Sequence, residues 1–357
     1  MTLTAEERKV LYSIKVASEN DPHKPEFPPH APKFPATPTY KIKVPGFTNV
    51  WLKDESENPT GTHKDRMAWE MVVTYRDILL AKKDDLMNEK LPRLSIITSG
   101  SAGVAIQTML NHYGLPPLKC LVDLDLKHEI VEQLEALGCE LYFVDLTRKP
   151  LTWKEILEYT QNVGGIDVTS AEGLSPSTRF YDWLSYEIIN QSPDYCFIPF
   201  GSGHLYENIL NVNKREVSST HHDPRFKGDT NRLRNCHFMG ATVNDPDSTA
   251  DKLYAPHRPF LVFEEQWIRC FRLSGFCGSD SNVVIVREKF IEQALEITQE
   301  QSIETDASGV AGLALLLQMS DRVPKDAKIF IVNTGRTKTA RVRNQMIATK
   351  ATSLSVR

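Results

Sequence analysis

Lys64 is the residue of this sequence whose surroundings point most clearly to chemistry. It belongs to residues 58–66, between a strand-like run and a long helical pattern. A proline and Gly61 predict a turn there, and Thr60 or Thr62 can cap the helix that follows. A lysine at a helix start, shielded by hydroxyls and against the positive end of the helix dipole, has its charged form disfavoured. A neutral amine can act as a Schiff-base nucleophile, although most lysines near helix starts are simply solvated.

A second candidate site is the turn formed by Thr98, Ser99, Gly100 and Ser101, directly after a strand-like run. Backbone amides at the helix start that follows, together with small hydroxyl side chains, favour binding of an anion such as a carboxylate. An ordinary strand-to-helix turn has the same pattern and is the commoner explanation of this motif alone.

A third candidate is Gly201-Ser202-Gly203-His204-Leu205, again between a strand-like run and a helix. Two glycines let the backbone approach a phosphate closely, and the serine hydroxyl adds a donor. No Gly-Lys-Ser/Thr sequence follows, which argues against a nucleotide P-loop.

The fourth candidate is Thr334, which follows the last strand-like run of the chain. Ligands of open α/β sheets bind at the carboxyl ends of the strands, where this hydroxyl is expected. As part of a loop alone, the residue would be unremarkable.

The elements that must position these residues alternate between strand and helix. Expected strands are 50–53, 94–98, 118–122, 141–144, 195–199 and 328–332, and expected helices are 102–113, 129–137, 180–189, 206–212, 289–301 and 309–319. Such alternation predicts parallel sheets with helices on both faces. We therefore expect an α/β protein with two open, mostly parallel sheets and a cleft between them. Residues 20–40, rich in proline, predict an extended arm.

Composition narrows the classes of function. The chain has 357 residues, of which 41% are hydrophobic and 25% charged, as in soluble globular proteins. A net charge of −4 gives no reason to expect nucleic acid or an anionic membrane as a partner. No apolar run is long enough to cross a bilayer, and the first residues are too polar for a signal peptide.

Cysteine usage indicates a reducing, cytoplasmic environment. The six cysteines show no CxxC spacing. Cys236 and His237 with the histidines at 221 and 222 fit no standard zinc pattern, so we expect no metal site.

Together, the four motifs resemble those of the fold type II pyridoxal-phosphate enzymes in order and spacing. That group includes threonine synthase, cysteine synthase, threonine dehydratase and the tryptophan synthase β chain. The resemblance spans roughly residues 36–338, and residues 304–312 are similar to the Glu-Pro-Ser-Gly-Ala-Ala-Gly stretch of the threonine synthase and dehydratase branch. The implied architecture is two three-layer αβα domains with pyridoxal 5'-phosphate in the cleft between them.

The resemblance implies a role for each candidate. Lys64 would form the Schiff base with the cofactor and act as the acid and base at the substrate Cα. Thr334 would face the pyridine nitrogen. The residues implied to hold the cofactor phosphate are Gly201, Ser202, Gly203, His204 and Leu205. The residues implied to hold the substrate carboxylate are Thr98, Ser99, Gly100 and Ser101, the last of which also lies near the cofactor.

Two positions depart from the family pattern. Ser101 stands where the family usually has an asparagine that contacts the 3' oxygen of the cofactor, and His204 stands where glycine is common. Residues 1–80 and 158–357 are expected to form a larger cofactor-binding domain, and residues 81–157 a smaller, mobile domain for the substrate carboxylate. The polar segment 213–235 is expected to be a surface insertion.

The resemblance implies elimination or replacement at Cβ or Cγ of a small amino-acid substrate. A threonine-synthase-like reaction on O-phosphohomoserine comes first, because of residues 304–312, with cysteine-synthase-like β-replacement next and a dehydratase third. A cofactor-binding protein with little catalysis and a partner-binding role is the alternative from another class. An unrelated α/β protein with coincidental motifs is the last. Members of the family commonly form homodimers.

Overall fold

The computed structural model describes residues 36–81, 92–146, 148–169, 180–245, 247–254, 275, 277–278 and 282–336. Most of the arm expected over residues 20–40 lies outside these ranges. The larger of two sheets has six strands in the order β1-β2-β10-β7-β8-β9. Its strands are β1 (Thr39–Val44), β2 (Phe47–Asp54), β7 (Tyr195–Pro199), β8 (His237–Thr242), β9 (Asn282–Ile285) and β10 (Ile329–Asn333). The β1–β2 pair is antiparallel and the other four pairs are parallel.

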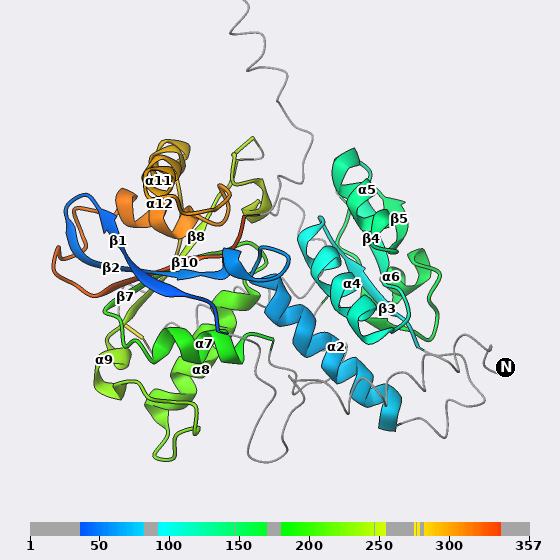
Figure 1. The fold of residues 1–357 in the computed structure, drawn as a ribbon, viewed down its shortest axis with the longest axis horizontal. Helices are drawn as coiled ribbons and strands as arrows, with labels where there is room; N and C mark the ends of the chain where they lie inside the picture. Colours follow the sequence, from blue (N-terminus) through cyan, green and yellow to red (C-terminus); the bar gives the residue numbers. More distant parts are fainter. Residues whose placement is uncertain are drawn as a thin grey trace, which may run out of the picture.

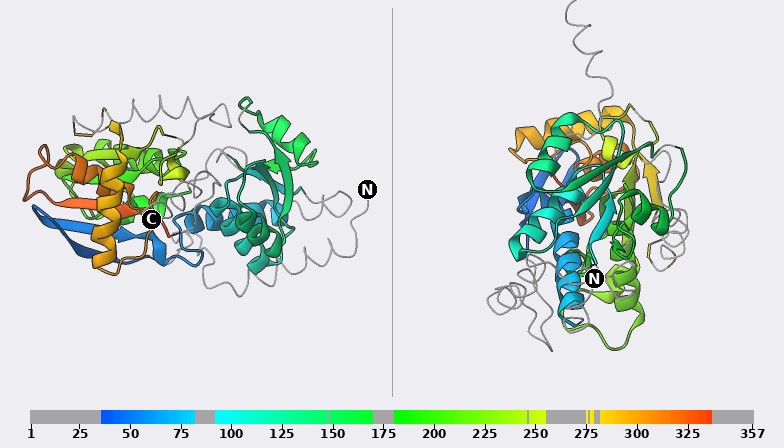
Figure 2. Two further views of the ribbon diagram at one scale, coloured as in Figure 1. Left: turned by 90° about the horizontal axis from the view of Figure 1, so that it is seen from above. Right: turned by 90° about the vertical axis from the view of Figure 1, so that its right-hand side faces the viewer.

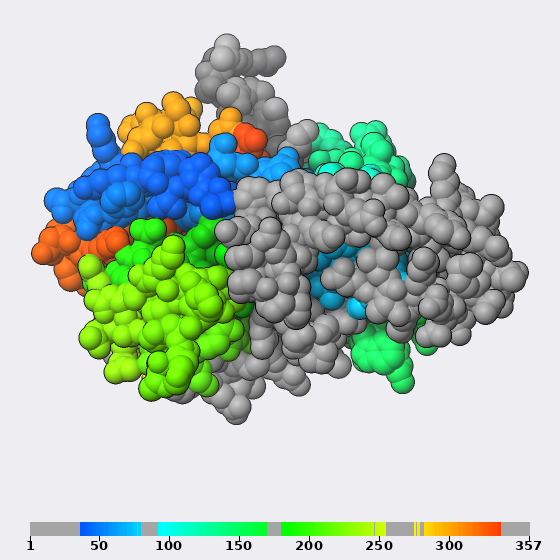
Figure 3. Space-filling view, turned by 60° about the horizontal axis from the view of Figure 1, so that its bottom comes forward, coloured from blue at the N-terminus to red at the C-terminus, as the bar shows by residue number. Residues whose placement is uncertain are grey.

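Helices cover both faces of this sheet (Figure 1). One face carries α11 (Glu288–Glu300) and α12 (Ala311–Gln318), and the other carries α7 (Asp182–Ile189), α8 (His204–Ser218) and α9 (Thr230–Arg234). The space-filling view shows β1 and β2 next to the region of α8 and α9 on one face (Figure 3). The central strand β10 is buried along its whole length, as expected for a parallel strand covered on two sides.

The smaller sheet has four parallel strands in the order β5-β4-β3-β6. These strands are β3 (Leu94–Ile97), β4 (Lys119–Asp123), β5 (Glu140–Val144) and β6 (Ile166–Asp167). Its helices are α4 (Ser101–Tyr113), α5 (His128–Ala136) and α6 (Trp153–Tyr159). The α/β class with two open, mostly parallel sheets is therefore confirmed.

Helix α2 (Lys64–Ala81) connects the two halves of the molecule. It follows β2 and the short 3-10 helix η1 (Glu55–Glu57) of the larger half, and it packs along α4 of the smaller half (Figures 1 and 2). Among the described residues, no helix has both the length and the apolar character needed to span a membrane.

Two expected boundaries differ from the structure. Strand β6 pairs with β3, so the smaller sheet extends beyond the expected limit at residue 157. Because β6 has only two residues, it left no strand pattern in the sequence.

The expected surface insertion at residues 213–235 also differs. Its first six residues continue α8, which begins at His204 and not at residue 206 as expected. Asn213 and Glu216 are buried there, and Glu216 accepts a hydrogen bond of 2.6 Å from the Tyr186 hydroxyl. The polar composition of this helix end predicts a solvent-exposed loop, but its polar side chains are buried and hydrogen-bonded.

Candidate active site

Three of the four candidate motifs follow neighbouring strands of the larger sheet. Strands β2, β10 and β7 lie side by side and run parallel, so their carboxyl ends meet at one edge. The chain leaves β2 toward Lys64, β10 toward Thr334 and β7 toward Gly201. Parallel sheets gather ligand-binding loops at this edge.

Lys64 is the first residue of α2, and its backbone N–H lies 3.4 Å from the Thr62 hydroxyl. The side chain is half-buried, and the desolvation that results lowers the pKa of its amine to about 8. Among the described residues, no carboxylate forms an ion pair with Lys64 to offset this effect. A substantial neutral fraction is therefore present near neutral pH, as a Schiff-base lysine requires.

The Lys64 turn is joined to the loop that contains Thr334. The carbonyl of Thr334 accepts hydrogen bonds from the His63 backbone N–H at 3.0 Å, from His63 Nδ1 at 2.9 Å and from the Thr62 hydroxyl at 3.2 Å. Thr62 and Gly335 form an isolated antiparallel bridge. A Cβ atom on Gly335 would lie 2.8 Å from the Gly61 carbonyl oxygen, so only glycine permits this approach.

Hydrogen bonds between Asp65 and Thr60 stabilise the turn locally. Asp65 accepts hydrogen bonds from the Thr60 backbone N–H at 2.8 Å and from the Thr60 hydroxyl at 2.7 Å. Burial raises the pKa of Asp65 to about 6, and the bonds from Thr60 act in the opposite direction.

Arg66 connects the turn to two other elements through ion pairs. Its guanidinium forms a bidentate pair with Glu55 at 2.8 and 2.9 Å and a second pair with Glu187 of α7 at 2.7 and 2.9 Å. Burial acts to raise the pKa of Glu55, but the charges of Arg66 and Lys53 outweigh it and hold that pKa below its usual range. Arg66 and Glu55 therefore stabilise the fold of the turn that carries Lys64.

The turn after β7 has the features of a phosphate-binding loop. Gly203 adopts φ 85°, and α8 begins at the next residue, His204. A Cβ atom on Gly201 would lie 2.9 Å from the carbonyl oxygen of Lys252, so the close approach requires glycine. The hydroxyl of Ser202 lies 3.1 Å from His204 Nδ1.

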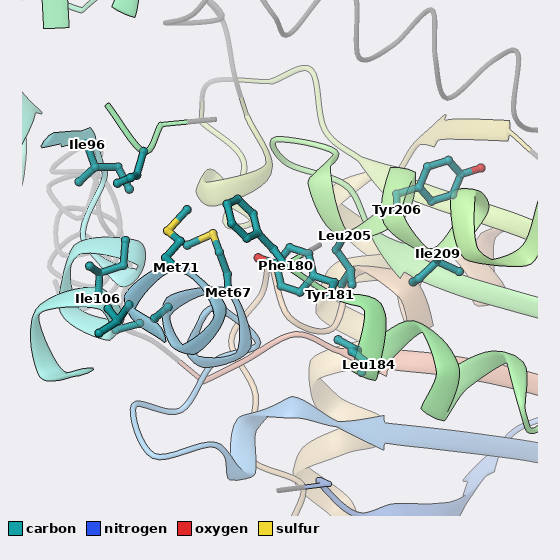
Figure 4. Close-up of a cluster of buried hydrophobic side chains, with 14 of the residues drawn as sticks. Met67, Met71, Ile96, Ile106, Phe180, Tyr181, Leu184, Leu205, Tyr206 and Ile209 are labelled. Carbon is teal, nitrogen blue, oxygen red and sulfur yellow. The ribbon is translucent and has the colours of Figure 1, made fainter. Parts of the chain in front are cut away.

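Within the described part of the chain, the backbone donors of this turn are not used. Among the residues that the structure describes, no acceptor takes up the backbone N–H groups of Gly201, Ser202 or Gly203. Leu205, the last residue of the motif, is buried among hydrophobic side chains that include Tyr181 (Figure 4). Free amides at the start of a helix suit an anion such as a phosphate.

The candidate carboxylate turn lies in the smaller sheet, after β3. The buried Thr98 hydroxyl accepts hydrogen bonds from Gly100 N at 3.0 Å and Gly103 N at 3.2 Å. Both acceptor positions of the hydroxyl are thereby filled, so its remaining capacity is to donate. The amides of Ser99 and Ser101 have no acceptor in the described part of the chain.

The structure brings the candidates together to different degrees. The turn that carries Lys64 is hydrogen-bonded to Thr334 through His63, and Gly201 follows the strand next to β10. No described hydrogen bond joins Ser101 to Lys64. Their connection is the packing of α4, which begins at Ser101, along α2, which begins at Lys64.

A further group of residues supports the Thr334 loop, and the sequence interpretation gave these residues no place among the site residues. Thr305 donates a 2.8 Å hydrogen bond to the Asn333 side chain, and Asp306 accepts one of 2.8 Å from Gly309 N. Asp306 also pairs with Lys252 at 2.8 Å. The resemblance of residues 304–312 to a family motif is the feature of the sequence that could have pointed to Thr305 and Asp306 as site residues. Their contacts with β10 depend on the fold.

Comparison with known proteins identifies the family of this chain. A family model described as pyridoxal-phosphate dependent enzyme matches residues 33–335. The chain therefore belongs to the family of pyridoxal-phosphate dependent enzymes. Its cofactor is pyridoxal 5'-phosphate, and the Lys64 amine, the free amides after β7 and the hydroxyl-bearing loop at Thr334 fit that group. No protein of curated function matches the sequence significantly.

Solved structures share the fold at low sequence identity. Maize serine racemase has a TM-score of 0.60 and 15% identity, with 96% of each chain covered. Diaminopropionate ammonia lyase from Escherichia coli has a TM-score of 0.61 and 14% identity, with 93% of this chain and 89% of that chain covered. Threonine deaminase isoform 2 from Solanum lycopersicum has a TM-score of 0.58 and 15% identity, with 100% and 95% covered.

Proposed function

We propose that this protein catalyses elimination or replacement at Cβ or Cγ of a small amino acid, with pyridoxal 5'-phosphate attached to Lys64. The observation that carries the proposal is the half-buried Lys64 amine, which has a lowered pKa and no ion-pair partner among the described residues. Lys64 follows β2, and the Thr334 loop and the Gly201–Gly203 turn begin at the carboxyl ends of the neighbouring strands. When bound, the cofactor supplies an electron sink for charge that develops at the substrate Cα.

Each residue of the site has a proposed task toward that cofactor. The amides of Gly201, Ser202 and Gly203, the start of α8 at His204, and the packing of Leu205 would hold the phosphate. The Thr334 hydroxyl would face the ring nitrogen. A hydroxyl does not hold a proton on that nitrogen as a carboxylate would, which favours prompt loss of a leaving group over a long-lived carbanion. Lys64, once released, would move the proton at the substrate Cα.

The turn after β3 would bind the substrate carboxylate. Thr98 keeps one O–H to donate, and the amides of Ser99 and Ser101 point to no acceptor among the described residues. Gly100 adopts φ 125°, which turns the chain into α4. We assign the six-stranded half to the cofactor and the four-stranded half, with its expected mobility, to the substrate carboxylate.

The covalent assignment is tested on the purified full chain. We expect a visible absorption band from bound cofactor, loss of that band on borohydride reduction, and a modified peptide that contains Lys64. Lys64→Ala should bind cofactor without a reducible link, while Lys149→Ala, which removes an exposed lysine, should behave as wild type. Reduction that modifies another lysine would refute the assignment.

The reaction is tested with a panel of substrates. A threonine-synthase-like reaction on O-phosphohomoserine is our first expectation, on the basis of residues 304–312, and O-acetylserine tests cysteine-synthase-like replacement. Serine, threonine and 2,3-diaminopropionate test the substrates named for the three solved structures described above. Spectral change or product with one of these amino acids is expected. A protein that responds to none of them would rule out the proposed activity.

A cofactor-binding protein with little catalysis is the second candidate. Ser101, which replaces the expected asparagine, and His204 in the phosphate turn favour it. Under that alternative, wild type keeps its cofactor band but does not change with any amino acid, and Ser101→Asn gains a response. A response of wild type equal to that of Ser101→Asn would exclude this alternative.

The oligomeric state and the cellular location of the protein are also part of the proposal. We propose a homodimer, which light scattering of the purified chain tests directly. We propose a cytoplasmic location, supported by the free thiols of Cys120, Cys139, Cys196, Cys236 and Cys277.

A further inference from the structure

We propose that His63 is a positioning residue: a neutral imidazole that fixes the Lys64 turn against the Thr334 loop and so sets the environment of the Lys64 amine. This inference rests on the proposed function in one respect, namely that Lys64 is the reactive lysine. It concerns a residue to which neither the family motif nor the substrate assignment gives this task.

His63 forms hydrogen bonds through both its backbone and its side chain. Its backbone N–H and its Nδ1 each lie within 3.0 Å of the same acceptor, the carbonyl oxygen of Thr334. Since a carbonyl only accepts, Nδ1 must carry the proton, and Nε2 is then the unprotonated nitrogen. A single residue thus places two hydrogen bonds between the Lys64 turn and the end of β10, which are 271 residues apart in the chain.

The charge state of His63 suits this role. Burial, and after it the positive charge of Lys64, lower the pKa of His63 to about 3, against the smaller opposing effects of the Thr334 carbonyl and Glu55. Arg66 acts in the same direction as Lys64. His63 therefore stays neutral at working pH, keeps its donor on Nδ1 and adds no second cation beside the lysine.

The buried ring of Tyr181 lies beside the imidazole ring of His63. The ring of Tyr181 lies 5.5 Å from that of His63, with 31° between the ring planes, and the Tyr181 side chain is 1% exposed. Figure 4 shows Phe180 and Tyr181 between Met67 of α2 and Leu205 of α8. Burial raises the pKa of the Tyr181 hydroxyl, so this neighbour is also neutral. His63 is thus in contact with the Tyr181 ring and hydrogen-bonded to the Thr334 carbonyl.

A purely steric role for His63 makes a different prediction from a positioning role. Leucine fills a similar volume but cannot donate to Thr334, whereas asparagine places an amide N–H close to where Nδ1 stands. If the hydrogen bond to Thr334 matters, His63→Leu should loosen the turn and let water reach Lys64, while His63→Asn should keep the turn closed.

The test measures the pKa of Lys64 in the full-length chain after removal of the cofactor. Trace acetylation with acetic anhydride at a series of pH values, followed by peptide mapping, gives the titration of this lysine alone. Wild type should titrate at about 8. In His63→Leu the pKa should rise by at least about one unit, a tenfold change in the neutral fraction. His63→Asn and Tyr181→Phe, which retains the ring, should stay near the wild-type value.

Nitrogen-15 NMR of labelled histidine provides a second readout. The His63 signals, identified by their loss in His63→Asn, should show the Nδ1–H tautomer and no titration between pH 5 and 9. Equal Lys64 titration in the leucine and asparagine variants, or protonation of His63 in that range, would overturn the proposal. Failure of borohydride to modify Lys64 in wild type would instead refute the proposed function, so the two failures are distinct.

Discussion

The Lys64 turn and the Thr98–Ser101 turn both start a helix after a parallel strand, but different parts of the chain fix them. Contacts with Glu55, Glu187 and Thr334 hold the Lys64 turn, and these residues belong to η1, α7 and the loop after β10. The turn after β3 is held from within, because the Thr98 hydroxyl takes up two of its own amides. Beyond the turn itself, the Thr98 backbone N–H donates to the Leu121 carbonyl of β4 at 3.1 Å, and Ile130 of α5 lies close to Gly100.

This difference suits the two tasks that we propose. A covalent attachment site must keep one geometry against the rest of the cofactor site, so anchoring by distant strands is an advantage. A turn that is complete by itself can move as a unit with its sheet and still present the same donors to a carboxylate. The following experiments test whether the Lys64 turn depends on distant contacts more than the carboxylate turn does.

The largest effect is expected from Arg66→Leu. It leaves the buried Glu55 and the partly exposed Glu187 without their guanidinium partner, and removal of one member of a buried ion pair costs about 3–5 kcal/mol. Urea unfolding should show this loss of stability. Arg148→Leu, which removes an arginine that is 80% exposed, should change stability by less than about 0.5 kcal/mol. A similar small loss in Arg66→Leu would mean that distant anchoring is unimportant.

A pH-dependent effect is expected at Asp65. Its pKa in the folded protein, about 6, lies above the value of about 4 for a free side chain. Its contribution to stability is therefore complete below pH 4 and is lost as the pH rises through 6. The unfolding free energy of wild type relative to Asp65→Asn should fall by about 2–3 kcal/mol between pH 4 and pH 7.

Thr60→Val provides the matched variant for this titration. It removes the hydroxyl that donates to Asp65 at 2.7 Å and that favours the charged carboxylate. The pKa of Asp65 should then rise further, and the pH at which stability is lost should move upward. A stability difference that does not change with pH would contradict the assignment.

Gly100→Ala probes the geometry of the carboxylate turn. Its φ of 125° is strained for alanine, and the new Cβ would lie 2.7 Å from Ile130 Cγ2. We expect a loss of about 1–3 kcal/mol in thermal unfolding. Gly138→Ala is the control, because φ is 96° there and nothing lies within 4 Å of the added atom. A loss in Gly100→Ala no larger than in the control would show that α5 does not constrain the turn.

The smallest change in stability is expected from Thr98→Val, at about 1–2 kcal/mol, because water can reach part of the helix start that loses its acceptor. The functional effect should be specific: a higher KM for the amino-acid substrate, with the cofactor band unchanged. Thr98→Ser retains the hydroxyl and should behave as wild type. Loss of cofactor binding in Thr98→Val would show that the two turns are not independent.

The sequence by itself determined the local parts of this protein. Glycine and proline marked the turns, and alternating apolar runs gave α4, α5, β7 and α11 to within one or two residues, because side-chain burial has a period that the sequence displays. It also identified Lys64, Thr334 and the Gly201–Gly203 turn as candidates, since each stands in a loop or at a helix start that follows a strand-like run. It missed β8 and β9, and the two-residue strand β6 carried too little pattern to detect.

The tertiary structure decided which of these parts meet. The strand order β2-β10-β7 places three loops from distant parts of the chain at one edge, and no local pattern contains that order. Arg66 and Glu55 look like surface charges in the sequence, yet they pair in the interior because both are desolvated by the same packing. Glu216 was assigned to a surface insertion for the same reason. The pKa of Lys64 likewise depends on how the folded chain surrounds the amine, which composition alone cannot specify.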